Sequence, residues 1–110
     1  MVADDHAAVR SGAVRLITHG GEFDVVGEAG DGDEAVRVVA KVRPDVVLMD
    51  LSMPGLDGVE VIRAITTDHP GAAVVVFTGW LDRDRLARAV GAGAFGHVLK
   101  DCSGEDLLGM

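Results

Sequence analysis

The sequence predicts an α/β fold in which a parallel sheet is covered on both faces by helices. Three observations carry this prediction: strand-like segments alternate with helical segments five times, the inner strands are continuously apolar, and the connecting turns are short. The helical connections are expected to be right-handed crossovers. The 110 residues are enough for one domain with a single core, and they contain no internal repeat, low-complexity segment or linker.

The first strand and helix lie at the start of the chain. Residues 1–3 form a short apolar strand that is followed by two carboxylates. Small and apolar side chains recur at helical spacing over residues 6–18, which predicts a helix. Glycines at 20 and 21 end this helix, because glycine adopts the left-handed conformation favoured at a helix C-terminus.

A second strand and helix follow. Residues 25–29 are the predicted strand, and residues 30–32 form its turn. The helix extends from about residue 33 to residue 42. Pro44 stops it, because the residue before a proline is pushed out of the helical region.

The third strand is the most strongly marked. Residues 46–49 are a continuous apolar run that ends abruptly at Asp50. A turn at Pro54 follows, and the side-chain oxygen of Asp57 can cap a helix over about residues 58–67.

The last third of the chain repeats the alternation. Residues 72–78 form a fourth apolar strand, a helix is predicted over about residues 82–92, and residues 95–99 form a fifth strand. Ser103 can cap the first turn of a last helix, which the chain leaves incomplete at Met110.

Composition limits the class of function. Ten Lys and Arg against eighteen Asp and Glu give a net charge of −8, which would repel a nucleic-acid backbone. There is no apolar run long enough to span a bilayer and no apolar segment typical of a signal peptide, so we expect a cytoplasmic protein without membrane contact. A single cysteine, Cys102, cannot form an internal disulfide and fits a reducing compartment. It is interpreted as a small packing residue, with redox sensing as the alternative.

Asp50 has two interpretations when it is considered alone. It can simply end a strand and begin a turn, as many aspartates do. It can also lie in a ligand-binding crevice, because ligands of open α/β sheets bind at the carboxyl ends of the strands.

Polar residues end or follow four of the five predicted strands, and this favours the second interpretation. They are Asp4 and Asp5, Asp50, Thr78, and Lys100. Because parallel strands end at the same edge of the sheet, we expect three carboxylates, a hydroxyl and an ammonium to meet there. Clustered carboxylates repel one another unless a cation neutralises them, and such oxygen ligands suit Mg²⁺ together with phosphate oxygens. The ammonium of Lys100 adds a point charge suited to a small dianion.

The same residues carry a family resemblance that covers essentially the whole chain. Asp4-Asp5-His6, the stretch Met-Asp-Leu-Ser-Met-Pro-Gly-Leu-Asp-Gly at 49–58, Thr78, and Leu99-Lys100-Asp101 together resemble the receiver domain of two-component response regulators. The Asp-Asp-His start and the Leu-Lys-Asp end are most similar to receivers of the NarL/FixJ (LuxR-type) transcription regulators.

The resemblance implies a fold and a domain organisation. The fold is the three-layer, doubly wound, five-stranded parallel sheet of flavodoxin-like and CheY-like proteins, with strand order 2-1-3-4-5. Residues 1–110 would be one receiver domain with a shortened first strand, a truncated last helix and no effector domain. Either the chain is part of a longer regulator, which we favour, or it stands alone and covers the exposed apolar surface by dimerising.

The resemblance also implies a mechanism. Asp50 would accept a phosphoryl group from a sensor histidine kinase or a small phosphodonor. Mg²⁺ would be held by Asp5, Asp50 and the backbone carbonyl of Ser52, with Asp4 acting through water. Lys100 and Thr78 would bind phosphoryl oxygens, and the domain would be a switch that catalyses only its own phosphotransfer and dephosphorylation.

The expected output is a change of packing that Thr78 transmits. Phosphorylation adds about −1.5 to −2 charges, so Thr78 and Lys100 gain partners that exist only in the modified state. The implied consequence is homodimerisation or docking on an effector domain, which would regulate transcription and contact DNA.

Three positions depart from the family pattern or tune it. His97 stands where receivers usually carry Tyr or Phe as a switch; it is interpreted as a half-buried polar edge residue, with a pH-sensitive switch as the alternative. Ser52 and Trp80 stand where receivers control the access of water to the phosphoryl group.

Two other classes of function compete with the switch. One is a phosphate-independent interaction or scaffold module with a receiver fold, against which the acidic residues, Thr78 and Lys100 argue. A nucleotide-binding enzyme is suggested by the glycines of residues 27–32, but their spacing does not match the dinucleotide fingerprint. The four histidines have no spacing typical of a zinc site.

Overall fold

The chain folds as a five-stranded parallel sheet with the strand order β2-β1-β3-β4-β5, as the sequence predicts. The computed structural model describes residues 1–51, 53, 57–78 and 83–99, together with the backbone but not the side chains of Thr78 and Leu99. The elements are β1 (Val2–Ala3), α1 (Ala7–Gly20), β2 (Glu28–Ala29), α2 (Gly32–Val42), β3 (Val46–Met49), α3 (Gly58–Asp68), β4 (Ala73–Thr78), α4 (Arg83–Gly91) and β5 (Gly96–Leu99).

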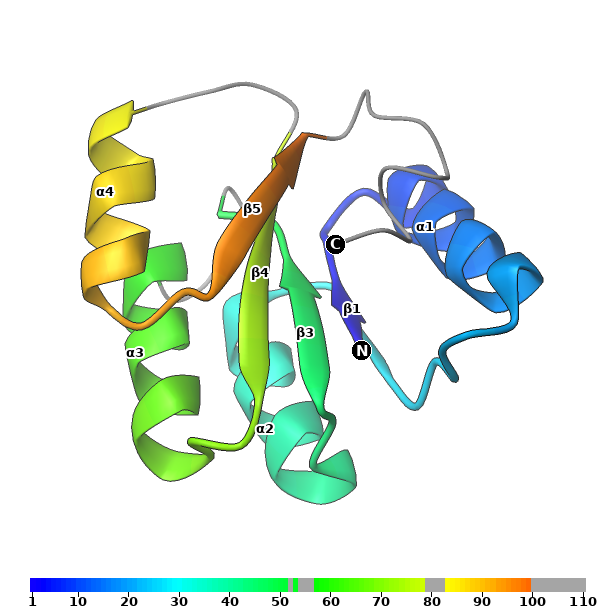
Figure 1. Cartoon of the computed structure of the whole chain (residues 1–110), viewed down its shortest axis with the longest axis horizontal. Coiled ribbons are helices and arrows are strands. Elements are labelled where there is room, and N and C mark those ends of the chain that lie inside the picture. The colour runs from blue at the N-terminus through cyan, green and yellow to red at the C-terminus, as the bar shows by residue number, and fades with distance from the viewer. Residues whose placement is uncertain (52, 54–56, 79–82, 100–110) are drawn as a thin grey trace.

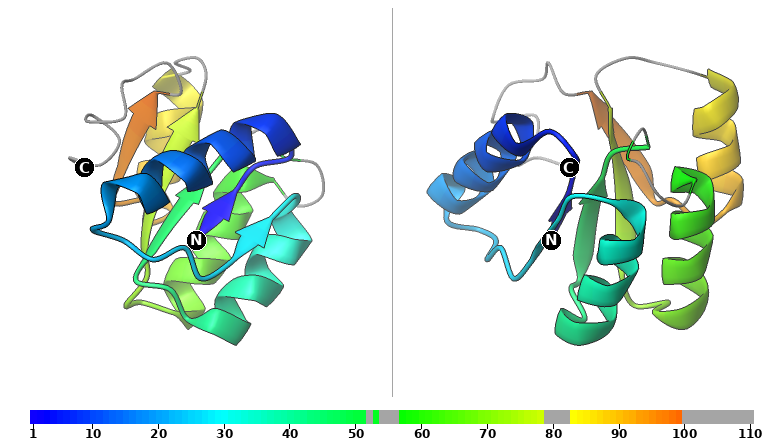
Figure 2. Two further views of the ribbon diagram at one scale, coloured as in Figure 1. Left: turned by 90° about the vertical axis from the view of Figure 1, so that its right-hand side faces the viewer. Right: turned by 180° about the vertical axis from the view of Figure 1, so that it is seen from behind.

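Helices lie on both sides of the sheet (Figure 1). Helices α2, α3 and α4 lie on one side and α1 on the other, and the view from behind shows the same layers (Figure 2). The larger apolar cluster lies on the side of α2, α3 and α4 and includes Val47, Met49, Ile62 and Val76, all fully buried. The smaller cluster, on the side of α1, consists of Val2, Ala13, Ile17, Leu48, Val75 and Phe77. Burial of both faces of β3 and β4 explains why these strands are continuously apolar.

The second strand is shorter than predicted. The prediction was residues 25–29, whereas β2 contains only Glu28 and Ala29, which pair with Val2 and Ala3. Val25 and Val26 come before the two residues that pair with β1. They lead into β2 but are not part of its pairing with β1. A strand is stabilised by hydrogen bonds to the adjacent strand. Because β1 is only two residues long, it pairs with only two residues of β2.

Helix ends follow the expected local chemistry with shifts of one or two residues. Gly21 ends α1 with a left-handed backbone (φ 75°) and donates to the carbonyl of Thr18. The side chain of Asp57 caps α3 by accepting from the N–H of Val59 at 2.8 Å, as predicted. Asp31 caps α2 in the same way, and Arg43 ends it with a left-handed backbone (φ 46°).

Two apolar residues of α1 do not face the core. Val9 is 36% and Leu16 is 45% exposed, whereas Ala13 and Ile17 are buried. The stripe of α1 that contacts the sheet is therefore narrower than the periodicity predicted. The last helix predicted from Ser103 lies outside the described residues, so its truncation stays a prediction. None of the described helices is both long and apolar enough to cross a membrane.

Candidate functional site

The site lies where β1 and β3 end side by side. The ladder between these strands continues past β3, because the N–H of Asp50 donates to the carbonyl of Ala3 at 3.0 Å. On the other side of β1, the N–H of Asp4 donates to the carbonyl of Ala29 at 3.0 Å. These bonds fix the backbones of Asp4 and Asp50 beside each other. Both residues are buried, at 0% and 2% exposure.

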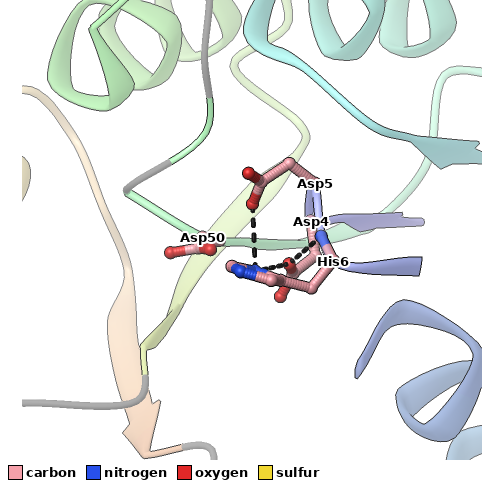
Figure 3. Close-up of side chains that lie close together, drawn as sticks. All are labelled: Asp4, Asp5, His6 and Asp50. Carbon is pink, nitrogen blue, oxygen red and sulfur yellow. Dashed lines mark hydrogen bonds and ion pairs between the residues drawn. The ribbon is translucent and has the colours of Figure 1, made fainter. Parts of the chain in front are cut away.

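The side chains of Asp4, Asp5, His6 and Asp50 form a ligand cluster at this edge (Figure 3). One potential ligand atom from each residue lies within 4.8 Å of those of the others. The side chain of Asp5 is 29% exposed, so the ligand cluster is open to solvent on this side. Carboxylates this close repel one another, and two of the three are buried, which makes a divalent cation a favourable partner. The donor set, rich in carboxylate oxygen, fits Mg²⁺.

The ring of His6 lies against the carboxylates. Its Nδ1 is 3.1 Å from Oδ1 of Asp5 and 3.3 Å from Oδ1 of Asp4. The backbone N–H of His6 also donates to Oδ1 of Asp4 at 2.9 Å. The residue is therefore held to Asp4 twice, through its backbone and through its ring.

Arg10 fastens α1 to the end of β1. Its Nη1 donates to the backbone carbonyl of Asp4 at 2.6 Å, and its Nε donates to the Glu28 carboxylate at 3.2 Å. One guanidinium thus joins three elements beside the ligand cluster: α1, the end of β1, and β2. We interpret Arg10 as a residue that positions Asp4, because it donates to the backbone carbonyl of Asp4.

The backbone next to Asp50 is held from two sides. Nη2 of Arg85, in α4, donates to the carbonyl of Leu51 at 2.7 Å. From the other side, Gly58 at the start of α3 approaches so closely that a Cβ there would lie 2.9 Å from Cα and O of Leu51. A side chain at position 58 would push the two segments apart. Leu51, which follows Asp50, therefore contacts both α3 and α4.

The structure describes only one of the remaining residues discussed for this edge, Thr78, and for it only the backbone. Thr78 is the last residue of β4 and pairs in register with Leu99, the last residue of β5. The register of β3 with β4 brings Met49 opposite Val76, so Asp50 and Thr78 both lie at the carboxyl edge. Lys100, which follows β5, and Ser52, Trp80 and Cys102 lie outside the described residues.

His97 lies away from the ligand cluster. It is exposed, whereas the sequence interpretation was a half-buried edge residue, and it stands in β5 opposite Val76. The edge position in the sheet is as expected. The greater exposure follows from that position, because β5 has a neighbouring strand on one side only in the described sheet.

Sequence reasoning missed the contacts of His6, Arg10 and Arg85. The histidine belongs to the Asp-Asp-His motif, but a search for zinc sites by the spacing of histidines passes over a single histidine beside aspartates. Arg10 has a weak signal, since it lies one helical turn after His6 in α1. The contact of Arg85 joins residues 34 positions apart, and no local pattern indicates it.

Comparison with known proteins agrees with this geometry. The family model described as "Response regulator receiver domain" matches residues 1–110. The transcriptional regulatory protein YhcZ of Bacillus subtilis is 40% identical over 108 residues, which cover 98% of this chain and 50% of YhcZ. The chain thus spans about half the length of the curated relatives it matches.

Solved structures give the same result. The signal receiver domain of NarL from Mycobacterium tuberculosis superposes with a TM-score of 0.93 at 34% identity and covers 98% of this chain and 87% of that one. The isolated receiver domain of RcsB from Salmonella enterica, solved with the phosphomimetic BeF₃⁻, gives a TM-score of 0.86 at 30% identity, covering 96% and 79% of the two chains. Sequence, topology and the acidic edge agree: the chain belongs to the response regulator receiver domains, and its relatives are of the NarL/LuxR type.

Proposed function

We propose that this receiver domain is a phosphorylation-activated switch and that Asp50 is its phosphoacceptor. The observation that carries the proposal is the position of Asp50. It is a buried carboxylate at the end of β3, within a cluster that also contains Asp4 and Asp5. Burial and the repulsion between neighbouring carboxylates make the charged form of Asp50 unfavourable. Groups placed in this way are typical of functional sites.

The proposed reaction is a transfer between two nucleophiles. A carboxylate oxygen of Asp50 attacks the phosphorus of a phosphohistidine on a sensor kinase, or of a small acyl phosphate. The new phosphorus–oxygen bond forms as the bond to the leaving imidazole nitrogen or carboxylate breaks, and the leaving imidazole takes up a proton. Water later attacks the aspartyl phosphate, which restores the Asp50 carboxylate and releases inorganic phosphate. Apart from this chemistry on itself, the domain acts as a signalling module and not as an enzyme.

The ligand cluster would hold the cation that this reaction needs. Asp5 and Asp50 are the proposed direct ligands, joined by the backbone carbonyl of Ser52, while Asp4 acts through water. A bound Mg²⁺ would neutralise charge on the phosphoryl oxygens and orient them. The protein's own contribution is to hold the carboxylates fixed. Arg10 does this through the backbone of Asp4, and Arg85 and Gly58 do it through the backbone beside Asp50.

Thr78 and Lys100 are the proposed partners of the phosphoryl group. Thr78 ends β4 at the same edge as Asp50, and Lys100 comes directly after β5 in the sequence. Their hydroxyl and ammonium would bind oxygens that appear only on phosphorylation. The new bonds would favour one of two packings of α4 and β5, with a coupling free energy of about 1–3 kcal/mol. His97, in β5, would respond to this change.

The output is proposed from the chain's relatives. YhcZ is named as a transcriptional regulatory protein and is about twice as long as this chain. We expect this receiver to control dimerisation or an effector domain that contacts DNA, since its own net charge of −8 does not suit DNA binding. A sensor histidine kinase is the proposed source of the phosphoryl group, and the cytoplasm is the proposed location of the domain.

The test is direct phosphorylation. The protein is incubated with Mg²⁺ and acetyl phosphate, and its intact mass is measured. We expect one added phosphoryl group in the original protein and none after Asp50→Asn. Asp45→Asn, at an exposed aspartate shortly before β3, is the matched control and should be phosphorylated normally.

Two results would contradict the proposal. Phosphorylation that survives Asp50→Asn would assign the acceptor to another residue. A protein that takes up no phosphoryl group with or without Mg²⁺, and whose oligomeric state does not respond to BeF₃⁻, would instead be the phosphate-independent interaction module.

A further inference from the structure

His6 introduces a nitrogen donor into a site otherwise built from carboxylates. The ring is 64% exposed, so it is held beside the carboxylates without being buried by other side chains. Its Nδ1 belongs to the same ligand cluster as the oxygens of Asp4, Asp5 and Asp50. Nothing in the proposed phosphoryl transfer uses this ring, and its placement therefore needs its own explanation.

The local backbone explains why the ring faces the carboxylates. His6 occupies the N-cap position of α1, with an extended backbone (φ −87°, ψ 103°). Residues at this position often cap the helix with their side chains. Within the described part of the chain, the His6 ring makes no such bond, and it turns back toward Asp4 and Asp5 (Figure 3).

The distances match those between ligands of one ion. Around an octahedral ion with bonds of about 2.1 Å, neighbouring ligand atoms are about 3.0 Å apart and opposite ones about 4.2 Å. The Nδ1 of His6 is 3.1 Å from Asp5 Oδ1 and 3.3 Å from Asp4 Oδ1. The ring nitrogen and the Asp5 oxygen can therefore occupy neighbouring positions around one cation with little movement.

We propose that His6 is a ligand of the cation bound at Asp5 and Asp50, and that it sets the cation preference of this receiver. The proposal rests on the cation site of the proposed function and extends it to metal selectivity. Imidazole nitrogen binds Zn²⁺ and similar transition metals well, whereas Mg²⁺ prefers oxygen ligands. Two carboxylates and one imidazole are a donor set typical of Zn²⁺ in proteins. Zn²⁺ would compete with Mg²⁺ at this site, and His6 would decide how well.

The experiment compares Zn²⁺ and Mg²⁺ binding by isothermal titration calorimetry at about pH 7.5. All proteins carry Cys102→Ser, so that the chain's single thiol does not bind Zn²⁺. The variants are His6→Phe and, as the matched control, His19→Phe in the last turn of α1. We expect His6→Phe to weaken Zn²⁺ binding at least about tenfold and Mg²⁺ binding less than about threefold. The His19 control should change neither.

A second measurement needs no substitution at the site. The ¹⁵N chemical shifts of the histidine rings are recorded in the Cys102→Ser protein as Zn²⁺ is added. We expect the Nδ1 signal of His6 to move to a shift typical of metal ligation. The ring signals of His19, which lies at the other end of α1, should stay unchanged until Zn²⁺ is in large excess.

The outcomes separate this inference from the proposed function. If Mg²⁺ binds and Asp50 is phosphorylated but His6→Phe leaves Zn²⁺ affinity unchanged, the inference is wrong and the proposed function stands. Equal loss of Mg²⁺ and Zn²⁺ affinity, with no change of the Nδ1 shift, would make His6 a structural residue and also overturn the inference. If the original protein binds neither cation, the proposed cation site fails and the inference fails with it.

Discussion

The two edges of the sheet differ in what a ligand would meet: a cavity at one edge and a cluster of charged side chains at the other. At the amino edge, where the strands begin, a cavity of about 500 Å³ is lined by residues that include Met1, Ile17, Phe23 and Val46. At the carboxyl edge, the ligand cluster brings four potential ligand atoms within 4.8 Å of one another. This cavity and the ligand cluster therefore lie at opposite ends of the strands.

This contrast shows how a site for a small charged ligand is built. A cation and a phosphoryl group need few protein groups, but these must be held at fixed positions. The carboxyl edge provides such support through backbone contacts, from Arg10 to Asp4 and from Arg85 to Leu51. Ile17 and Leu48, which line the cavity at the amino edge, belong to the smaller apolar cluster, so this edge contributes to stability.

The largest expected difference between the edges is in cation binding. Asp5→Asn removes a proposed ligand, and we expect the affinity for Mg²⁺ to fall about 100-fold, which is about 2.7 kcal/mol. Asp24→Asn, an exposed carboxylate beside the cavity at the amino edge, should leave the affinity unchanged. Calorimetric titration of both variants measures the contrast. Equal affinities in the two variants would show that the ligand cluster is not the cation site.

Substitutions at the amino edge should change the free energy of unfolding and not cation binding. Ile17 is 7% exposed and belongs to the smaller apolar cluster, so Ile17→Ala should lower the free energy of unfolding by about 2 kcal/mol. We expect the low end of the usual range because the side chain already borders a cavity. Leu16→Ala, the neighbouring and 45% exposed position, should cost much less. Urea unfolding measures both, and the Mg²⁺ affinity of the Ile17 variant should equal that of the original protein.

The carboxyl edge was more predictable from sequence than the amino edge. Parallel topology follows from the alternation of elements, and it brings Asp4 and Asp50 together wherever the two strands end. The cavity could not be foreseen, because it depends on residues 22–26 running alongside the sheet without pairing. That in turn depends on β1 being two residues long, so that in the described sheet Val25 and Val26 are not paired with β1.

The contacts that support the site were not predictable either. Arg85 reaches Leu51 only because α4 packs beside α3, and such packing leaves no local sequence pattern. The orientation of the His6 ring was missed for a different reason. His6 is part of the Asp-Asp-His motif. Whether an N-cap side chain faces the helix or the residues before it depends on backbone angles, which the sequence alone does not determine.

The smallest effect is expected at His97, which is exposed in β5 and belongs neither to the ligand cluster nor to the lining of the cavity at the amino edge. His97→Tyr should change the free energy of unfolding by less than about 0.5 kcal/mol and leave phosphorylation at Asp50 intact. Its effect should appear only in dimerisation after BeF₃⁻ treatment, as a less than tenfold strengthening, because an aromatic ring replaces a group that can carry charge.

The pH dependence of that dimerisation decides between the two interpretations of His97. A proton gained by the His97 ring would place one positive charge on each copy at this position. If the two copies of His97 face each other, association should weaken as the pH falls from about 8 to about 5.5, and His97→Tyr should remove the dependence. Sedimentation velocity across this range measures both proteins. A dimerisation constant that stays the same for the original protein would make His97 an ordinary residue of an edge strand, and the switch would then depend on Thr78 and Lys100.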